Sequence, residues 1–254
     1  MQEARVAFLR QGPASALLDS GVVVVSHQIE YHRPIAYDAL PVTIELGVSE
    51  LRASRLQLSY TVRQGELAAV ARTVLCAFDF DLQRPIRLLP GYREFFSGHM
   101  VDAAPFRVIE APELAGRGLP VPLPVRWSDL DAYGHVNNAM VYDFVQQARV
   151  AATTTWDPTM ARAGTKDSDR LWLVVRQDVH YLSQIPHRVE PFTALVAPVK
   201  LGSSSMTLAT EIMDQGSGLV FARATTVLVS ADLTGRPVDL GDTTRARLAS
   251  HLAP

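Results

Sequence analysis

The sequence predicts an α+β fold built from two related domains. Three observations predict it: an internal repeat that covers nearly the whole chain, a helical pattern near the start of each copy, and a series of strand-like runs after each helix. Strands that follow one another without intervening helices favour an antiparallel sheet, because parallel strands need long crossover connections. The 254 residues are enough for two domains, each with its own hydrophobic core.

The repeat consists of matches that occur in the same order in both halves of the chain. Gln2–Ala7 matches Gln146–Ala151, and Arg84–Leu88 matches Arg236–Leu240. The offset between the copies grows from 144 to 152 residues, as small loop insertions would produce. A period of this length is far too long for a solenoid unit, so it indicates a duplicated domain.

The repeat also predicts the domain boundaries. We expect an N-terminal domain over residues 1–98, a linker over 99–120 that contains proline and glycine, and a C-terminal domain over 121–254. The first copy begins inside its helix, so the strand that precedes the helix in the second copy has no counterpart in it. Either roughly 25 residues are missing from the start of the chain or the first copy has lost its first strand, and we favour a late start.

The individual elements follow from the spacing of apolar residues. Apolar residues that fall on one helical face predict helices over 4–18, 92–96 and 139–156. Alternating or β-branched runs predict strands over 22–31, 41–48, 55–62 and 68–80 in the first copy and over 123–127, 171–181, 191–201, 206–213 and 219–229 in the second.

Composition excludes several classes of protein. Cys76 is the only cysteine, so no disulfide can form within the chain and a cysteine-based zinc site is not expected. The formal net charge of -2 gives no electrostatic footprint for nucleic acid. No apolar run is long enough to span a membrane, and the N-terminus has no signal-peptide layout. We therefore expect a cytoplasmic protein that binds neither nucleic acid nor membrane.

One loop carries most of the chemically useful side chains. Between a predicted strand and the second long helix, ten residues contain Asp129, Asp131, His135, Asn137 and Asn138. The start of a helix offers unpaired N–H groups and the positive end of the helix dipole, which can polarise a carbonyl group. A carboxylate beside it could act as a nucleophile or as a general base. The same residue types also occur in loops that do no more than cap a helix.

The motif in this loop resembles a known family signature. Arg126-x-Ser128-Asp-x-Asp131-x-x-Gly134-His-Val-Asn-Asn138 is followed by Gln147-Ala-Arg149. It is similar to the signature of the hotdog-fold acyl-CoA thioesterases, the group typified by 4-hydroxybenzoyl-CoA thioesterase. The resemblance implies two hotdog domains, each an antiparallel sheet wrapped around a long central helix, with the first copy lacking its N-terminal strand. It further implies that the two domains pair within the chain, and it leaves a further homo-oligomer open.

The resemblance also implies roles for single residues. Asp131 corresponds to the catalytic carboxylate, which attacks the thioester or activates water. The backbone N–H groups around Val136–Asn138 would polarise the thioester carbonyl, with Val136 and Asn138 as substrate-binding residues. His135 and Asn137 would line the site and orient water or the acyl group, and we expect Asp129 to brace the loop.

Two predicted turns complete the expected substrate site. The resemblance suggests that such turns lie near the phosphates of coenzyme A, and their residues can donate the required hydrogen bonds. The residues concerned are Arg52 and Ser54 in the first copy and Gly202, Ser203 and Ser204 in the second. Coenzyme A is part of the substrate, and no separate cofactor is expected.

A metal site is not expected either. His27, Glu30 and His32 are close in sequence, but on a strand His27 points away from the other two. Three ligands therefore do not converge.

The sequence thus predicts an acyl-CoA thioesterase, which hydrolyses an acyl-CoA to a free acid and coenzyme A. A protein of the same fold that binds acyl-CoA without hydrolysing it is the main alternative. A hotdog hydratase or dehydratase is a weaker one, because those enzymes resemble one another in an Asp-x-Asn-Pro-x-His pattern. Asp131 and His135 have neither that spacing nor the Asn-Pro pair.

Overall fold

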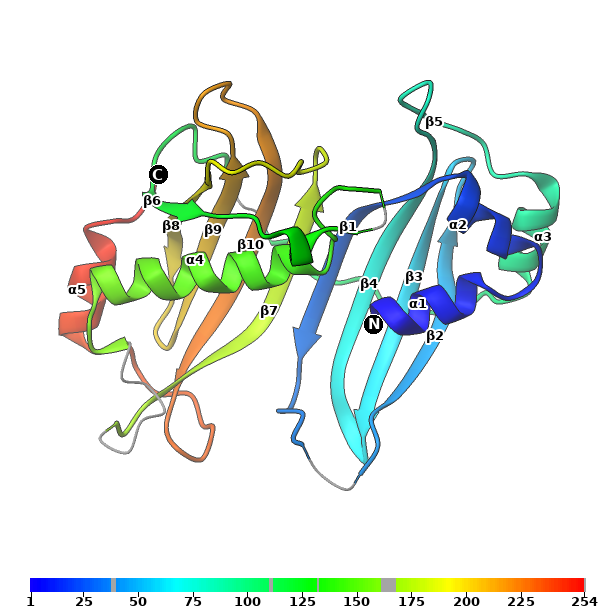
Figure 1. Cartoon of the computed structure of the whole chain (residues 1–254). Helices are drawn as coiled ribbons and strands as arrows, with labels where there is room; N and C mark the ends of the chain where they lie inside the picture. The colour runs from blue at the N-terminus through cyan, green and yellow to red at the C-terminus, as the bar shows by residue number, and fades with distance from the viewer. Residues whose placement is uncertain (38–39, 110–111, 132, 161–167, 254) are drawn as a thin grey trace. The chain divides into compact units, whose positions relative to one another are not determined.

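The structure is a computed structural model that describes residues 1–37, 40–109, 112–131, 133–160 and 168–253 (Figure 1). The chain divides into two compact units, unit 1 over Met1–Arg107 and unit 2 over Val108–Pro254. Each unit combines helices with an antiparallel sheet, so the predicted α+β class is confirmed.

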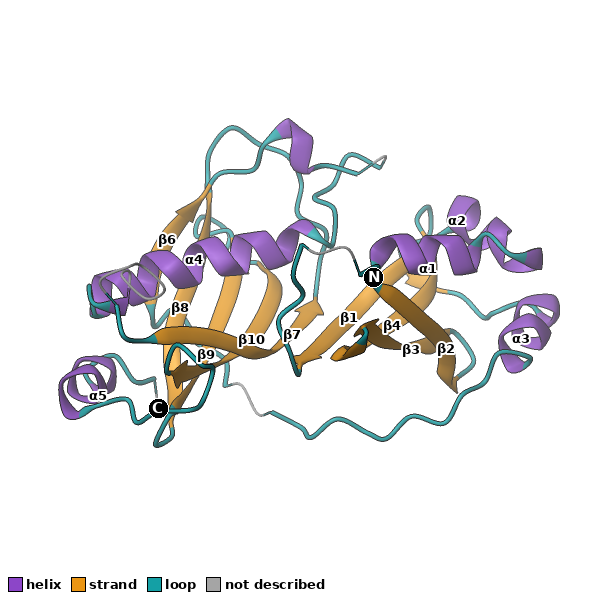
Figure 2. Cartoon of the chain, turned by 90° about the horizontal axis from the view of Figure 1, so that it is seen from below, coloured by secondary structure: helices purple, strands orange, loops and turns teal. Residues whose placement is uncertain are grey.

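Unit 1 contains a four-stranded antiparallel sheet in the order β2-β3-β4-β1, with the short β5 paired to β4. Helix α1 lies across one face of this sheet (Figure 2). The elements of unit 1 are α1 (Gln2–Leu9), η1 (Gly12–Ser15), α2 (Ala16–Ser20), β1 (Val22–Tyr31), β2 (Thr43–Leu51), β3 (Arg55–Gln64), β4 (Glu66–Asp79), β5 (Arg84–Pro85) and α3 (Pro90–Ser97).

Unit 2 contains a five-stranded antiparallel sheet in the order β7-β10-β9-β8-β6. The long helix α4 lies across one face of it (Figure 2) and buries Phe144, Val145, Ala148 and Ala152 against the strands. The elements of unit 2 are β6 (Leu119–Leu123), η2 (Trp127–Asp129), α4 (Met140–Trp156), β7 (Leu171–Tyr181), β8 (Phe192–Leu201), β9 (Ser205–Met213), β10 (Val220–Ala231) and α5 (Asp242–Ala249).

The first predicted helix, over 4–18, is interrupted in the structure. Helix α1 ends at Leu9, and a 3-10 turn and the short α2 follow it. Gly12 has a φ of +56°, which lies outside the helical region, and Pro13 has no N–H to continue the helical hydrogen bonds. The Gly-Pro pair therefore ends the helix, although the apolar spacing continues past it.

The strand predicted over 123–127 is also misplaced, because the observed strand β6 ends at Leu123. The prediction left out residues 119–122, which include Pro120 and Pro122. Yet β6 is an edge strand paired only with β8, and a proline is tolerated where its nitrogen faces away from the neighbouring strand. The alternate residues Val121 and Leu123 are buried towards α4.

Helix α5 was not predicted at all. It occupies the place in unit 2 that α3 occupies in unit 1, at the end of the repeated unit. Its sequence is rich in Thr and Arg and buries only Leu248, so it has little apolar periodicity by which it could be recognised.

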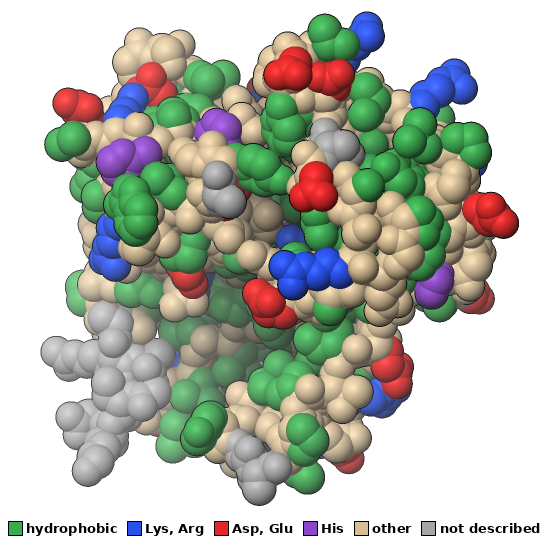
Figure 3. All heavy atoms as spheres, turned by 45° about the vertical axis from the view of Figure 1, so that its right-hand side comes forward, with side chains coloured by type: hydrophobic (Ala, Val, Ile, Leu, Met, Phe, Trp, Pro, Cys, Tyr) green, Lys and Arg blue, Asp and Glu red, His purple; other side chains and the backbone are tan. Residues whose placement is uncertain are grey.

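The surface shows no region dominated by one sign of charge on the face drawn in Figure 3, where basic and acidic side chains are interspersed. This distribution agrees with the small net charge of the sequence. Within the described parts of the chain, no helix is both long enough and apolar enough to cross a membrane.

Candidate active site

The loop between β6 and α4 is held in shape by Asp129. The Asp129 side chain is buried, and its carboxylate accepts a hydrogen bond from the Arg126 N–H at 2.7 Å. Its backbone carbonyl accepts a second one from the Asn137 N–H at 2.8 Å. One residue therefore connects the beginning of the loop with its end. Because both acceptors are used within the loop, this geometry suits a bracing role.

Asp131 lies at the tip of the same loop and is half-buried. Its Oδ1 atom accepts hydrogen bonds from the N–H groups of Tyr133 at 2.9 Å and His135 at 3.3 Å. Gly134, with a φ of +79°, lets the chain turn back so that the Asp131 N–H reaches the His135 carbonyl. Among the described residues, nothing donates a hydrogen bond to Oδ2. The carboxylate is thus fixed by one oxygen and has its other oxygen available for chemistry.

His135 and Val136 attach the loop to the connection between β7 and β8. The Val136 N–H donates to the Ile185 carbonyl at 2.9 Å, and His135 forms a β-bridge with Pro186. The Nδ1 atom of His135 is buried, and no described protein group forms a hydrogen bond with it. A buried ring nitrogen without a protein partner is unusual and is suited to bind a polar atom of another molecule.

Two asparagines lead from the loop into α4. The Asn137 side chain accepts a hydrogen bond from the Ala139 N–H at 3.0 Å, and its carbonyl accepts one from Met140 at 2.9 Å. The Asn138 carbonyl accepts a hydrogen bond from the Tyr181 hydroxyl at 2.8 Å. Asparagine is a favoured N-cap residue, yet the N-cap of α4 is Ala139 and neither asparagine occupies that position. The difference arises because the Asn137 side chain stabilises a separate turn just before the helix.

The hydrogen bonds of this segment limit which N–H groups can polarise a carbonyl. The N–H groups of Val136 and Asn137, two of those expected to do so, already donate to Ile185 and Asp129. In this conformation neither can bind a thioester oxygen. The positive end of the 17-residue helix α4 lies immediately after them. A carbonyl polarised here would therefore be bound by the first turn of α4.

The predicted phosphate-binding turn of unit 2 lies far from Asp131 within that unit. Residues Gly202–Ser204 follow the C-terminal end of β8, whereas the loop and its Pro186 contact lie near the N-terminal end. Ten residues of strand separate the two ends by about 30 Å. Unit 2 by itself therefore does not bring Gly202, Ser203 and Ser204 into one site with Asp131.

The turn itself is held by the helix that follows the sheet. Arg245 of α5 donates to the carbonyls of Gly202 and Ser203, at 2.9 and 3.0 Å. The Leu240 N–H also donates to Ser203, and the Ser230 N–H donates to the carbonyl of Ser204. These bonds occupy the carbonyl groups and fix the backbone of the turn.

Unit 1 repeats this arrangement at Arg52 and Ser54. Arg93 of α3 donates to the Arg52 carbonyl at 2.7 Å, and the Ala77 N–H donates to the Ser54 carbonyl at 2.9 Å. The Arg52 side chain is exposed and pairs with Glu50. The duplication therefore extends from the sequence to individual hydrogen bonds, and the carbonyl groups of both turns have a structural role in common.

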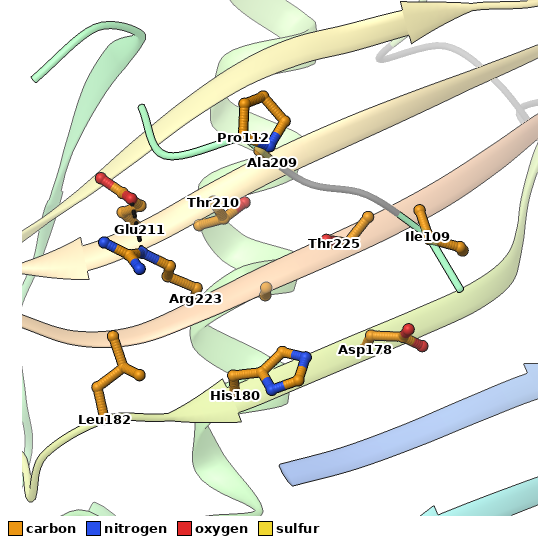
Figure 4. A pocket seen from close by; sticks show the side chains of 11 residues that line it. Ile109, Pro112, Asp178, His180, Leu182, Ala209, Thr210, Glu211, Arg223 and Thr225 are labelled. Atoms are coloured by element: carbon orange, nitrogen blue, oxygen red, sulfur yellow. Dashed lines mark hydrogen bonds and ion pairs between the residues drawn. The ribbon is translucent and has the colours of Figure 1, made fainter. Parts of the chain in front are cut away.

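A cavity of about 320 Å³ lies on the face of the unit 2 sheet opposite α4. Figure 4 shows an ion pair between Arg223 and Glu211 at one end of it and Asp178 at the other. Arg223 also pairs with Glu113, and Glu211 accepts a hydrogen bond from the Leu114 N–H. These contacts attach the segment before β6 to the sheet. The ionic groups at this end of the cavity are thus used in holding the chain together.

The matching arginine of unit 1 has a similar task. Arg72 donates to the Ala104 carbonyl and lies over the Phe106 ring, 4.5 Å from its centroid. The sequence indicated that the two arginines are equivalent, because Ala71-Arg72 and Ala222-Arg223 match in the repeat. It did not indicate what the arginines hold. In the described parts of the chain, no three His, Cys, Asp or Glu side chains lie close enough to share a metal ion.

The architecture and the loop together define a class of protein. A sheet wrapped around a central helix, occurring twice in one chain, is the double hotdog fold. The model of the thioesterase-like superfamily matches residues 1–109 and again 125–248. The chain belongs to this superfamily and is a thioester hydrolase. No curated protein sequence matches it at a significant level.

Solved structures share the fold over most of the chain. A protein described as an oleoyl thioesterase from Lactobacillus plantarum has a TM-score of 0.68 at 18% identity, covering 90% of this chain and 84% of its own. The 12:0-ACP thioesterase from Umbellularia californica has a TM-score of 0.68 at 14% identity, covering 86% and 77%. An acyl-ACP thioesterase from Bacteroides thetaiotaomicron has a TM-score of 0.60 at 13% identity, covering 85% and 80%. At these identities the likeness is one of fold.

Proposed function

We propose that this protein hydrolyses acyl-CoA thioesters and that Asp131 is its catalytic carboxylate. The observation that carries the proposal is the position of this side chain. Its Oδ1 atom is fixed by two backbone N–H groups, its Oδ2 atom has no donor among the described residues, and helix α4 begins nine residues later. A carboxylate oriented in this way beside a helix N-terminus combines a reactive oxygen with a means of stabilising an oxyanion.

Two routes are consistent with this geometry. In the first, Oδ2 attacks the thioester carbon and expels the thiolate of coenzyme A, and water then hydrolyses the resulting acyl-aspartyl anhydride. In the second, the carboxylate removes a proton from a water molecule, which attacks the carbonyl directly. Both give a free acid and coenzyme A, and in both the first turn of α4 would bind the carbonyl oxygen.

His135 and Asn137 have supporting roles in this proposal. The buried Nδ1 of His135 is suited to bind the attacking water or a substrate oxygen. Asn137 fixes the backbone between the carboxylate and the helix through its bonds to Ala139 and Met140. The Arg52 and Gly202 turns remain candidates for binding the phosphates, and the exposed Arg52 would exchange its ion pair with Glu50 for one with a phosphate.

The acyl group of the substrate can be carried by coenzyme A or by acyl carrier protein. Two proteins of similar fold are thioesterases for acyl groups on acyl carrier protein. Coenzyme A and acyl carrier protein present the same phosphopantetheine thioester, so Asp131 could act on either. We favour coenzyme A because the loop motif resembles the acyl-CoA thioesterases, and acyl carrier protein is the second candidate.

The test is to measure thiol release from a series of acyl-CoA substrates and from the matching acyl carrier protein substrates. Asp131→Asn keeps the size of the side chain and removes the negative charge. We expect it to lower kcat by about 10²- to 10⁴-fold, the usual contribution of a positioned base. Asp242→Asn is the matched control, because Asp242 is an exposed aspartate in the first turn of a different helix, α5.

The outcomes separate the alternatives. Unchanged hydrolysis in Asp131→Asn refutes the assigned role of Asp131. If acyl-CoA binds with no thiol release for any chain length or carrier, the proposed hydrolysis of these substrates is refuted and the site only binds them. A single turnover in ¹⁸O-labelled water tests for the first route, because label in the peptide containing Asp131 demonstrates an anhydride that water opens at the aspartyl carbon.

A further inference from the structure

Two hydrogen bonds in series connect the sheet of unit 2 to the turn that precedes α4. The Tyr181 hydroxyl donates to the Asn138 carbonyl at 2.8 Å. That carbonyl belongs to the same planar peptide group as the Ala139 N–H, which donates to Oδ1 of Asn137 at 3.0 Å. The series of bonds therefore runs from the hydroxyl, through one peptide group, to the Asn137 side chain.

The sheet fixes the position of the Tyr181 ring. Tyr181 is the last residue of β7 and pairs with Ala222 of β10. Its ring packs against the apolar cluster between the sheet and α4, which includes Val136 and Val141. A tyrosine side chain has only two rotatable bonds before its hydroxyl, so this packing leaves the hydroxyl little freedom. The sheet thus presents a donor of well-defined position to the start of the helix.

The peptide group that accepts this bond lies where its orientation matters for the proposed reaction. Ala139 is the N-cap of α4, whose first turn would bind the thioester oxygen. The carboxylate of Asp131 is fixed separately, by the N–H groups of Tyr133 and His135. The helix start and the carboxylate must therefore be aligned by contacts outside the tip of the loop. A displacement of about 1 Å between such groups can cost about 100-fold in rate.

The bond from Tyr181 depends on the type of side chain. The other contact described here, between the Val136 N–H and the Ile185 carbonyl, joins two backbones and is open to most residues. Phenylalanine at position 181 would keep the ring and lose the donor. A donor on the Asn138 carbonyl also polarises the peptide group and strengthens the bond that the Ala139 N–H donates. The hydroxyl thus stabilises the turn as well as holding it to the sheet.

We propose that Tyr181 is a positioning residue for thioester hydrolysis. Its hydroxyl holds the start of α4 in the orientation in which the first turn binds the carbonyl oxygen beside Asp131. This role rests on the proposed function, and the hydroxyl acts through the Asn138 peptide group without transferring a proton. Because negative charge forms on the carbonyl oxygen only in the transition state, loss of the hydroxyl should lower kcat more than it changes KM.

The test is the rate of thiol release from acyl-CoA substrates by Tyr181→Phe in the full chain. We expect kcat to fall on the order of tenfold with KM nearly unchanged. Tyr92→Phe removes the same hydroxyl group from α3 in unit 1 and is the matched control. Asp157→Asn weakens a contact at the opposite end of α4 and controls for loss of stability alone. Urea unfolding verifies that every variant is folded under the assay conditions, and both controls should keep the wild-type kcat.

A double variant tests whether Tyr181 acts through the peptide group. Asn137→Ala removes the acceptor at the other end of the series of bonds. In an Asn137→Ala background, Tyr181→Phe should therefore have little further effect on kcat, whereas independent losses would multiply. Hydrogen exchange of the backbone amides at the start of α4 should also be faster in Tyr181→Phe than in the wild-type protein.

The outcomes separate this role from the proposed function. If the wild-type protein releases thiol and Tyr181→Phe keeps its kcat, the role of Tyr181 is overturned and the proposed function stands. Losses that multiply in the double variant, an equal fall in kcat for Asp157→Asn, or unchanged hydrogen exchange overturn the role as well. A wild-type protein that releases no thiol refutes the proposed function, and the role of Tyr181 falls with it.

Discussion

Replacing His27 by glutamine should make unit 1 less sensitive to acid. His27 lies in β1 with only 8% of its surface exposed, and its Nδ1 atom is 2.7 Å from the Thr73 hydroxyl. Burial and the nearby guanidinium of Arg5, which is itself buried, lower the pKa of His27 to about 3. The equivalent residue in unit 2 is Gln177, which is also buried and cannot titrate. The variant therefore copies a residue that this fold already accommodates.

The sign and size of the effect follow from the two pKa values. An unfolded histidine titrates near 6.5, so between pH 6.5 and 3 the unfolded state binds a proton that the folded state does not. The contribution of His27 to stability is complete above pH 6.5 and is lost as the pH falls towards 3. At about 1.4 kcal/mol per pH unit, the loss reaches about 2 kcal/mol at pH 5. That is a large part of the 5–15 kcal/mol that typically stabilises a domain.

The assay is urea unfolding followed by far-UV circular dichroism at pH 7.5, 6 and 5. All three tryptophans, Trp127, Trp156 and Trp172, belong to unit 2, so their fluorescence reports that unit separately. His27→Gln should remove about 2 kcal/mol of the difference in unfolding free energy between pH 7.5 and pH 5. His180→Gln changes an exposed histidine of β7 and serves as the control. If His27→Gln and the wild-type protein lose stability equally between these pH values, the reasoning is refuted.

Two further predictions concern unit 2. Asp157 is completely buried and accepts hydrogen bonds from Thr244 and Arg247 of α5. Asp157→Asn should therefore cost about 2 kcal/mol in urea unfolding followed by tryptophan fluorescence, and a cost below about 0.5 kcal/mol would contradict the importance of this contact. Val121→Pro should remove a hydrogen bond between β6 and β8 and lower the free energy of unfolding by at least about 1 kcal/mol. Pro122→Val, at a position facing away from β8, should be close to neutral in the same urea unfolding experiment, and equal effects of the two variants would show that the orientation of β6 is wrong.

Local patterns predicted the long regular elements well. Strands β1 and β7 begin and end at the residues that alternation indicates, and α4 ends at Trp156 as predicted. Each depends on side chains close together in sequence, and their periodicity is strong. The break after Leu9 also had a local signal, Gly12-Pro13, which the apolar spacing outweighed in the prediction. Helix α5 could not be found in this way, because it is stabilised by contacts such as Arg247 with Asp157, 90 residues away.

The candidate site was predictable in its residues but not in its connections. The motif identified Asp131 and His135 as neighbours in one loop, and in the structure the His135 N–H donates a hydrogen bond to the Asp131 carboxylate. The contacts of Val136 with Ile185 and of Asn138 with Tyr181 were not predictable, because they link positions more than 40 residues apart. Those contacts decide which N–H groups near the carboxylate can still bind a substrate.

The sequence by itself determined that this protein is a duplicated α+β domain of hotdog type, and it identified the loop in which hydrolysis is expected. Repeats, periodicity and a short motif are local or collinear features, so they can be read without coordinates. Only the tertiary structure decided that Gly202–Ser204 lies at the opposite end of β8 from Asp131, and that β6 covers the outer edge of β8. Those facts depend on which strands pair, and pairing is fixed by hydrogen bonds and burial between distant segments that no local pattern encodes.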